Sequence, residues 1–437
     1  MSEEVKTRDH WGSRLGYVMS VIGMAVGLGA IWRFPMTAAM NGGGAFVLAF
    51  VIVTFAICIP AGWAEIGFGR WAQGGPVNAF GKLLGTKGKA LGGVIALIPL
   101  MLNMYYMIIV GWVIAYTYFS IQGVYFEQPV EFFQNFEANR VGSFLWTMLG
   151  LGITTLICLG GIKKGIEKAC KYMLPMMFFI LLVIAIRIAM IPGIAVGIDF
   201  YLRPDFGALL YPQIWVMAAG MALFALGLGP AFLLVYGSYL KSDNDVNLSY
   251  VTVALWSTLG CIIAGFATVP AVVLFELDKM TGSGLVFQVL PKVFYQLEGG
   301  QIWATVFFSG LIIAGLSTAI AIMEITVTAA QELFNWDRKK SVLTVATVTA
   351  LGAAACVWND GLIGTLDFIV TNIGFTFSAT ITAILLAWFY GAKRCREEWI
   401  NPGSDFQIGK WYDFVYKVPV CAILLWFCYQ AVVRLLG

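Results

Sequence analysis

Two glycine triplets are the residues of this sequence best suited to bind a small solute. GLG (27–29) and GLGP (227–230) lie 200 residues apart, each in the middle of an apolar stretch. Because proline removes a backbone donor and an unpaired backbone is tolerated in a membrane only around a cavity, both stretches are predicted to be helices broken midway. Freed N–H groups bind an anion such as a carboxylate, and freed carbonyls bind Na⁺ or an ammonium group. A small zwitterion is therefore the expected guest.

Glycine has a second meaning in membrane helices, where it lets neighbouring helices pack closely. With 49 glycines in the chain, one triplet alone would indicate close packing. The matched positions of the two triplets, and the proline after the second, favour broken helices instead. Paired interruptions of this kind indicate an inverted-repeat transporter with its site at the middle of the membrane.

Side chains that catalyse reactions are scarce. His10 is the single histidine, the eight cysteines form no CxxC pair, and no GxSxG, HExxH or P-loop motif occurs. Metal-centred, nucleophilic and ATP-driven chemistry has no visible site, so we expect a protein that is not an enzyme. The net charge of +3 is too small to indicate a nucleic-acid partner.

The composition places these features in a lipid bilayer. Of the residues, 60% are apolar and 12% are charged, which a water-soluble surface does not allow. Eleven charge-free stretches are long enough, or nearly so, to span a membrane. We predict an all-α integral membrane protein with 11 transmembrane helices: a 5+5 inverted repeat with helices 1 and 6 broken at mid-membrane, plus one extra C-terminal helix. The predicted parts are a cytoplasmic N-terminal segment (1–12), a first repeat (13–200), a second repeat (201–392), and an inner loop with the last helix (393–437).

Most of the 27 lysines and arginines fall in alternate loops between these stretches. Since basic loops stay on the cytoplasmic side, the N-terminus is predicted inside and, with an odd number of spans, the C-terminus outside. The polar first residues lack the apolar core and cleavage site of a signal peptide. We expect a multi-pass protein of the cell's inner membrane.

Several runs of residues resemble the signature of the neurotransmitter:sodium symporters, which carry amino acids and related amines together with sodium. The runs are RDHW (8–11), GMAVGLGAIWRFP (23–35), NGGGAF (41–46), FALGLG (224–229), AGLSTAIAIMEI (314–325) and LDF (366–368). The likeness covers residues 8 to 392 and implies a leucine-transporter-type fold. It also implies alternating access with Na⁺ as the coupling ion and no organic cofactor.

The resemblance places one sodium site, the family's second, between spans one and eight. Its ligands would be the carbonyls of Gly23, Val26 and Ala314 and the hydroxyls of Ser317 and Thr318. Oxygen-only coordination suits a hard cation. Hydroxyls in membrane helices also bond to carbonyls one turn back, which is the alternative for both hydroxyls. The resemblance favours sodium.

The family's first sodium site does not carry over. At its three side-chain ligand positions this chain has Ala30, Ala225 and Ser257, which are two methyl groups and one short hydroxyl. A methyl group cannot replace an oxygen around a desolvated cation. We expect a degenerate first site and the coupling of one Na⁺ to each substrate.

By the same resemblance, the substrate pocket consists of small and apolar residues around both breaks: Ala25, Gly27, Leu28, Gly29, Leu102, Tyr106, Phe224, Gly227, Pro230, Ala321 and Ile322. The backbone around Leu28 and Gly29 and the Tyr106 hydroxyl would hold a carboxylate. Apolar walls suit a small neutral or apolar amino acid. Gly27 stands where amine-carrying members have aspartate, so a non-amino-acid amine would lack a counter-charge and ranks second.

Arg33 and Asp367 match the family's outer gate, and on closure they would seal the site from outside. Static anchoring of Arg33 at a helix end is the alternative. The buried acids Glu65 and Glu324 are expected to accept hydrogen bonds from exposed backbone near the broken helices.

Arg8 and Glu332 match the family's cytoplasmic latch, with Trp11 packed beneath and Tyr239 nearby. Surface ion pairs contribute little free energy, so such a latch would open readily, as alternating access requires.

Two other classes of membrane protein share parts of this pattern. A channel needs a continuous polar lining, and the spans offer few acidic residues. A membrane sensor that binds its substrate without moving it would share every motif. The sequence gives no oligomeric state.

Overall fold

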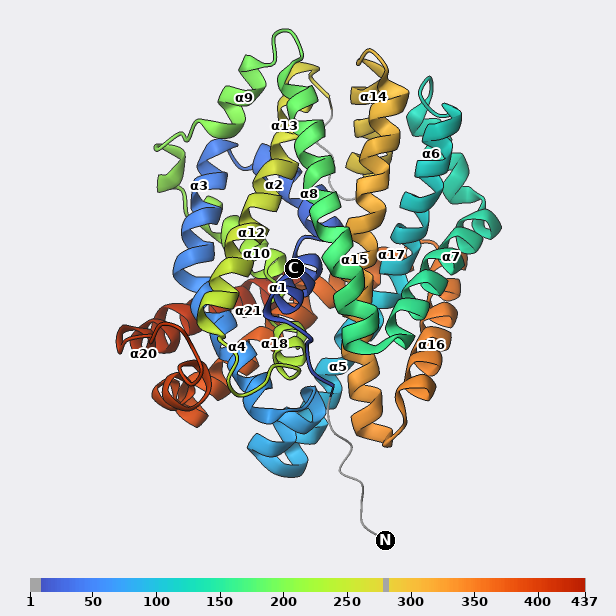
Figure 1. Ribbon diagram of the computed structural model, residues 1–437. Helices are drawn as coiled ribbons and strands as arrows, with labels where there is room; N and C mark the ends of the chain where they lie inside the picture. Colours follow the sequence, from blue (N-terminus) through green and yellow to red (C-terminus); the bar gives the residue numbers. More distant parts are fainter. Residues whose placement is uncertain (1–8, 278–282, 437) are drawn as a thin grey trace.

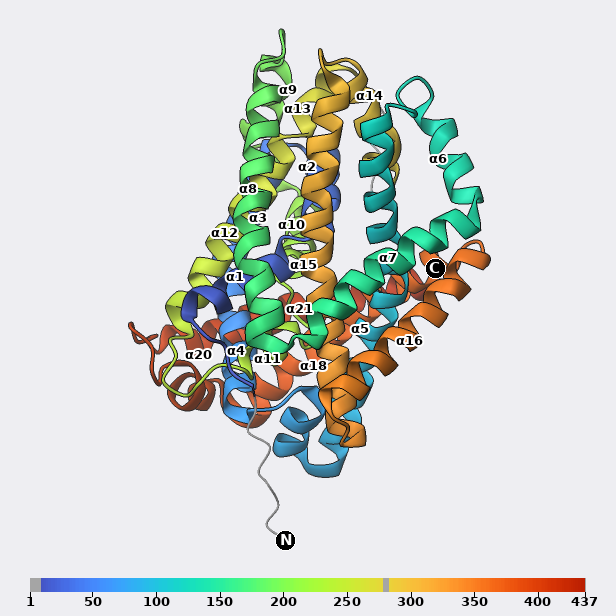
Figure 2. The same ribbon diagram turned by 45° about the vertical axis from the view of Figure 1, so that its right-hand side comes forward.

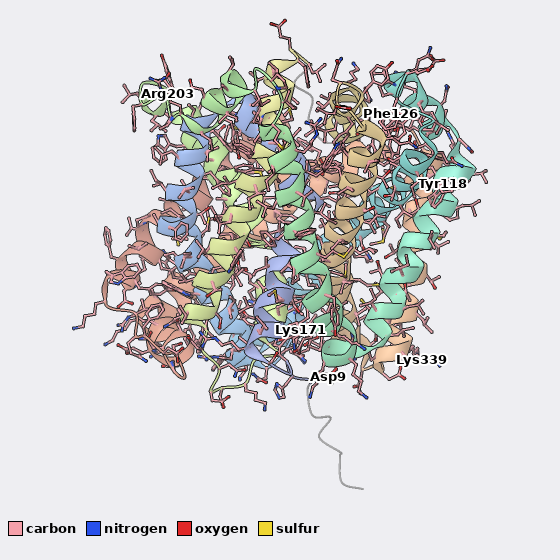
Figure 3. The ribbon with its side chains drawn as sticks, turned by 45° about the horizontal axis from the view of Figure 1, so that its top comes forward. Asp9, Tyr118, Phe126, Lys171, Arg203 and Lys339 are labelled. Atoms are coloured by element: carbon pink, nitrogen blue, oxygen red, sulfur yellow. The ribbon has the colours of Figure 1, made fainter. Side chains whose placement is uncertain are left out.

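The computed structural model describes residues 9–277 and 283–436, and this part of the chain is helical without any strand. The long helices run side by side in one bundle, with α20 near one end and α6 and α9 at the other (Figures 1 and 2). Large apolar side chains such as Leu156, Phe179 and Leu351 face outward. The charged residues Lys171 and Lys339 lie toward one end of the bundle and Arg203 toward the other (Figure 3). An apolar girdle between charged ends is the surface that a bilayer requires.

The first half of the chain contains nine α-helices, interrupted by short π-helical turns and followed by one 3₁₀ turn. They are α1 (Arg14–Ala25), α2 (Phe34–Met40), α3 (Gly44–Val53), α4 (Ile59–Ala72), α5 (Pro76–Gln122), α6 (Pro129–Ala138), α7 (Arg140–Leu159), α8 (Lys168–Ala189) and α9 (Ala195–Leu202), with the turns η1 (Gly29–Arg33), η2 (Thr54–Cys58), η3 (Ile162–Glu167) and η4 (Ala208–Leu210).

The second half has the same character. Its helices are α10 (Pro212–Ala225), α11 (Phe232–Gly237), α12 (Asn247–Phe266), α13 (Val269–Leu274), α14 (Leu290–Tyr295), α15 (Gly300–Phe334), α16 (Arg338–Trp358), α17 (Leu362–Asp367), α18 (Phe375–Ile384), α19 (Ala392–Arg394), α20 (Trp411–Val415) and α21 (Cys421–Leu436), with the π-helical turns η5 (Leu285–Val289), η6 (Phe368–Gly374), η7 (Leu385–Gly391), η8 (Cys395–Ile400) and η9 (Tyr416–Val420).

In the described residues, nine helices are long and apolar enough to cross a membrane, and the bent pair Arg14–Ala25 and Gly29–Met40 makes a tenth. The expected span over 206–240 is present as α10 and α11, of 14 and 6 residues, each too short to cross alone. A protein with many membrane-crossing helices is therefore confirmed. The number of eleven and the inverted repeat remain predictions.

Both predicted interruptions are present. Helix α1 ends at Ala25, Val26 leaves the helical region with φ −92° and ψ 62°, and the chain resumes at a bend of 45°. Between α10 and α11, the φ angles are +67° at Gly227, +114° at Gly229 and +64° at Ala231. Such left-handed backbone suits glycine and cannot belong to an α-helix, which explains why GLG breaks this span.

The bundle holds both breaks in its interior. Helix α15 packs along α5, and α1 lies against α8, α12 and α15. Seven of the eight cysteines are buried and the eighth, Cys428, is half-buried, and all eight are free thiols. They act as small packing residues, as expected from their spacing.

Candidate functional site

The hydroxyls of Ser317 and Thr318 on α15 reach across to the end of α1. Ser317 Oγ donates to the Gly23 carbonyl at 2.8 Å and to the Ala314 carbonyl at 3.0 Å. Thr318 Oγ1 is 3.2 Å from the Gly23 carbonyl and 3.1 Å from that of Met24. Bonding one turn back thus accounts for only one of these contacts, because the others join two helices that are far apart in sequence.

This arrangement brings together four of the five predicted sodium ligands, Gly23, Ala314, Ser317 and Thr318. The Val26 carbonyl accepts no hydrogen bond from either hydroxyl, so its role as a ligand stays a prediction. The Met24 carbonyl, which the sequence did not single out, stands beside Thr318 instead. Carbonyl and hydroxyl oxygens without a thiolate or imidazole suit Na⁺. Within residues 9–277 and 283–436, no three His, Cys, Asp or Glu side chains gather as a transition metal would require.

A cavity of about 60 Å³ lies between the two breaks. Eight of the eleven residues predicted for the substrate pocket line it: Ala25, Gly27, Gly29, Leu102, Tyr106, Phe224, Gly227 and Ile322. Leu28, Pro230 and Ala321 do not. Leu28 is fully buried and its side chain turns toward Gly315 on α15, because the chain has become helical again at this residue.

Several lining residues were not predicted: Met24, Trp32, Tyr105, Ile109, Phe232, Thr371 and Phe375. Phe375 forms an aromatic wall, with ring centroids 5.8 Å from Phe224 and 6.0 Å from Phe232. Met24 reaches the second break, where a Cβ added to Gly227 would lie 2.8 Å from its Cε. The sequence signal that could have identified Met24 as a pocket residue is its position between the predicted site residues Gly23 and Ala25.

The glycines of the first break make room for the pocket walls. A Cβ on Gly27 would overlap the Thr318 hydroxyl, and one on Gly29 would overlap the ring of Phe224. The Tyr106 hydroxyl is buried in the same region, near the Thr318 hydroxyl and the Leu28 backbone N–H. A buried hydroxyl donor beside freed backbone is suited to receive a carboxylate.

At the positions predicted to form a degenerate first sodium site, Ala30, Ala225 and Ser257 are all buried at 1% exposure. The Ser257 hydroxyl has no hydrogen-bond partner. One hydroxyl and two methyl groups offer a cation a single side-chain oxygen, which does not fit a well-coordinated Na⁺.

Arg33 and Asp367 lie at the mouth of the pocket, where it meets a larger cavity. Arg33 Nη2 is 3.5 Å from Asp367 Oδ2, and Tyr105 donates to Asp367 Oδ1 at 3.0 Å. The guanidinium also lies over the ring of Phe224, 4.9 Å from its centroid. The Arg33–Asp367 pair therefore partly closes the pocket, and the ring of Phe224 packs beneath the guanidinium.

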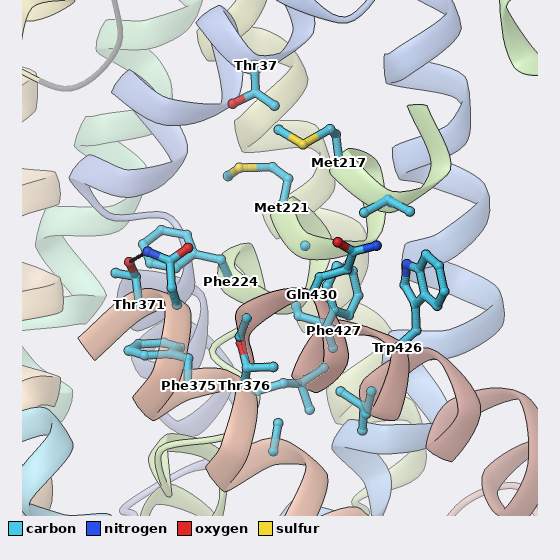
Figure 4. Close-up of a pocket in the computed structure, with 18 of the residues that line it drawn as sticks. Thr37, Met217, Met221, Phe224, Thr371, Phe375, Thr376, Trp426, Phe427 and Gln430 are labelled. Atoms are coloured by element: carbon cyan, nitrogen blue, oxygen red, sulfur yellow. Dashed lines mark hydrogen bonds between the residues drawn. The ribbon is translucent and has the colours of Figure 1, made fainter. Parts of the chain in front are cut away.

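Beyond this pair is a cavity of about 460 Å³ (Figure 4). Phe224, Thr371 and Phe375 line one side of it, while Phe427 and Gln430 of α21 line the other. Five residues line both this outer cavity and the pocket, and so separate the two spaces: Arg33, Phe224, Asp367, Thr371 and Phe375.

On the opposite side of the pocket, Trp11 closes the structure. Its indole donates to the Tyr236 carbonyl at 3.0 Å, and its backbone N–H donates to the Tyr239 carbonyl at 3.2 Å. Arg8 lies outside the described residues. Glu332 accepts hydrogen bonds from the backbone N–H groups of Gly75 and Asn78, at the start of α5.

The two buried acids differ from each other. Glu65 Oε1 accepts from the Gly229 N–H at 3.1 Å, so it contacts the second break as expected. Glu324 does not contact the backbone of a broken helix. It pairs with Arg338 at 2.6 Å and accepts from the Tyr239 hydroxyl at 2.7 Å, because α16 folds back and places the guanidinium beside it.

A second ionic contact on this side was not predicted. Arg14 lies 2.8 Å from Asp245 and 2.9 Å from Asp405, and it donates to Ser249 at 3.1 Å. We call these four residues the Arg14 clasp. The hydrogen bond from Arg14 lowers the pKa of Asp405. The clasp joins the start of α1 to the loops before α12 and α20, and no single motif indicates it.

A helical membrane bundle with two broken helices and an oxygen-lined cluster beside an apolar pocket has the features of a secondary transporter. The model of the sodium:neurotransmitter symporter family matches residues 8–128 and 124–436. The chain belongs to this family, whose members are transporters and not enzymes.

Individual relatives agree with this assignment. An uncharacterized sodium-dependent transporter of Haemophilus influenzae is 34% identical over 97% of this chain and 99% of its own length. The human sodium- and chloride-dependent GABA transporter 2 is 26% identical over 89% of this chain and 74% of its own. Among solved structures, MhsT in complex with L-phenylalanine superposes with a TM-score of 0.86 at 31% identity, covering 97% of this chain and 100% of that one.

Proposed function

We propose that this protein couples the uptake of a small neutral or apolar amino acid to Na⁺ by alternating access. The observation that carries the proposal is the position of Thr318. Its hydroxyl belongs to the oxygen cluster with the Gly23 and Met24 carbonyls, and the same residue lines the pocket between the breaks. An ion and a solute bound on the two sides of one side chain would stabilise each other, which is the basis of coupling.

The pocket supports an amino acid as the solute. Its walls are aromatic and aliphatic, and no carboxylate of the described chain lines it except Asp367, whose oxygens already bond to Arg33 and Tyr105. A carboxylate group would meet the buried Tyr106 hydroxyl, while an apolar side chain would face Met24, Phe232 and Phe375. The related MhsT structure holds L-phenylalanine.

We further propose that one Na⁺ moves with each substrate, because Ala30 and Ala225 leave the first site without side-chain oxygens. Eleven spans, with the N-terminus in the cytoplasm and the C-terminus outside, complete the proposal. This orientation rests on the distribution of lysine and arginine.

Reconstitution into proteoliposomes tests the function. Uptake of labelled L-phenylalanine, leucine, alanine and γ-aminobutyrate is compared under an inward Na⁺ gradient and under an equal K⁺ gradient. Saturable uptake of a neutral amino acid with Na⁺ alone is the expected result. Preference for the amine would move the assignment to the second substrate class.

Counterflow separates a carrier from the other classes. Vesicles preloaded with unlabelled substrate should accumulate external label transiently, because a carrier exchanges one molecule for another. Binding without exchange would identify a sensor, and non-saturable flux would identify a channel.

A further inference from the structure

The buried acids of the described chain are Glu65, Glu167, Asp245 and Glu324, and their surroundings are not equivalent. Three of them have a cationic partner: Glu167 pairs with Lys171 at 2.6 Å, Asp245 with Arg14 at 2.8 Å, and Glu324 with Arg338 at 2.6 Å. Glu65 is 5% exposed and forms no ion pair. A buried carboxylate without a counter-charge is far less stable than its neutral form.

The hydrogen bonds of Glu65 point to the neutral form. Oε1 accepts from the Gly229 N–H at 3.1 Å, whereas Oε2 is buried without any partner. The hydroxyls of Tyr250 and Tyr17 are also buried without a partner. A carboxyl group that carries a proton needs no counter-charge, which fits an Oε2 that accepts from no N–H, O–H or cation.

Tyr250 of α12 packs against the face of α4 that carries Glu65. Its ring and hydroxyl occupy the space over Gly62, where a Cβ would overlap them. Gly62 is three residues before Glu65, so the two positions are neighbours on the helix surface. Tyr250 is also within electrostatic range of Glu65, Tyr17 and Cys58.

We propose that Glu65 is a proton-binding site at the second helix break and that it carries its proton in the conformation seen here. Oε2 carries the proton, while Oε1 accepts from the Gly229 N–H. When α11 moves away from α4 and water enters, the proton passes to water and Glu65 becomes an anion. Movement of the break is thereby linked to the binding and release of one proton.

No cation on the surrounding elements counters this assignment. The guanidinium of Arg70, on the same helix, donates to the carbonyls of Asn244 and Trp399, and Arg396 of η8 pairs with Glu397 and Asp413. Helix α18 carries no titratable residue. The remaining titratable groups on the elements packed around α4 are Cys58 of η2, Lys82, Lys87, Lys89, Tyr105, Tyr106, Tyr116 and Tyr118 of α5, Tyr236 of α11, Tyr250 and Cys261 of α12, Cys395, Glu397 and Glu398 of η8, and Tyr416 and Lys417 of η9, together with Tyr17 of α1. Lys82 donates to the Trp71 carbonyl, and Lys417 lies over the ring of Trp388.

Infrared difference spectroscopy of the purified protein tests the proposal without any transport measurement. The spectrum at neutral pH, minus that at alkaline pH, should contain the carbonyl band of a protonated carboxylic acid. Glu65→Gln, which keeps the acceptor for Gly229 but cannot ionise, should lack this band. Glu324→Gln is the matched control, since it removes an equally buried but ion-paired acid and should keep the band.

Tyr250→Phe covers the case in which Glu65→Gln does not fold. It retains Glu65 and removes only the unpaired phenol hydroxyl that lies over Gly62, so the band should persist and should still disappear at alkaline pH. Absence of the band in the wild-type protein at neutral pH, its loss in Tyr250→Phe, or its persistence in Glu65→Gln would each overturn the assignment.

A second measurement rests on the proposed function. The wild-type uptake rate in proteoliposomes should change about ten-fold or more across the pH range in which the infrared band disappears, and Glu65→Gln should flatten this profile. Identical pH profiles in the two proteins would refute the link to transport. Absent uptake in both, with the infrared band intact, would instead count against the proposed function.

Discussion

Removal of the Ser317 hydroxyl should weaken sodium binding with little effect on the fold. The hydroxyl contacts the Gly23 carbonyl at 2.8 Å and the Ala314 carbonyl at 3.0 Å, so it occupies the centre of the oxygen cluster. An interaction between a buried polar group and a charge contributes about 1.5–3 kcal/mol. Since about 1.4 kcal/mol corresponds to a factor of ten, Ser317→Ala should lower the affinity for Na⁺ about ten- to hundred-fold.

Thermal unfolding of the purified protein in detergent measures this effect directly. The melting temperature is recorded against NaCl, with KCl added to keep the ionic strength constant. A ligand at free concentration L that binds only the folded state stabilises it by RT ln(1 + L/Kd), so the NaCl concentration at which the melting temperature begins to rise reports the affinity. Ser309→Ala is the matched control. Ser309 lies on the same helix, and its hydroxyl bonds one turn back to Thr305 at 2.7 Å, away from the cluster.

The expected outcome is a sodium titration shifted to higher concentration in Ser317→Ala and unchanged in Ser309→Ala. The melting temperature in KCl alone should be similar for both variants, which separates ion binding from packing. A Ser317→Ala titration that coincides with the wild-type curve would refute the sodium assignment, since the cluster would then be held together by hydrogen bonds alone.

Three further predictions concern the second break, the inner contacts and the stoichiometry. Gly229→Ala should lower stability by about 1–3 kcal/mol, because Gly229 has a φ of +114° and its new Cβ would lie 2.8 Å from the Phe375 carbonyl. Gly152→Ala is the control: Gly152 lies in α7 with no atom within 4 Å of an added Cβ, so the melting temperature should stay the same or rise. In the Arg14 clasp, Asp245→Asn should lower the free energy of unfolding by about 1–3 kcal/mol, because the Asp245 side chain is 3% exposed. The melting temperature should fall accordingly. Asp405→Asn should change little, because that side chain is 61% exposed, and equal effects would contradict the assigned burial. Uptake should depend on Na⁺ concentration hyperbolically, and a Hill slope near two would show that the first sodium site binds after all.

The parts of the site that follow from short motifs were predictable, and the parts that depend on chain reversal were not. The two GLG triplets indicated the breaks because glycine and proline act on the local backbone. The helical segment 314–318 fixed Ala314, Ser317 and Thr318 on adjoining positions of α15. The partner of Glu324 depends on Asn335, whose φ of +52° ends α15 and sends α16 back along it.

The pocket lining shows a similar limit. Periodicity predicts which face a residue occupies only while the helix continues, and α1 ends at Ala25. The direction of Met24 toward Gly227 therefore depends on how the two breaks meet. Phe375 was missed because η6 precedes it, and a π-helical turn changes the register of the following residues.

Helix α21 lies outside both predicted repeats, yet its residues Trp426, Phe427 and Gln430 line the outer cavity. The approach to the binding pocket therefore includes a stretch of sequence that the pocket itself does not use, although Arg33, Phe224 and Asp367 belong to both. Substitutions in the last helix would alter how quickly different solutes arrive and leave, while the groups that grip them remain the same. The rate of transport can therefore change through substitutions in the last helix while the residues that select the substrate stay the same.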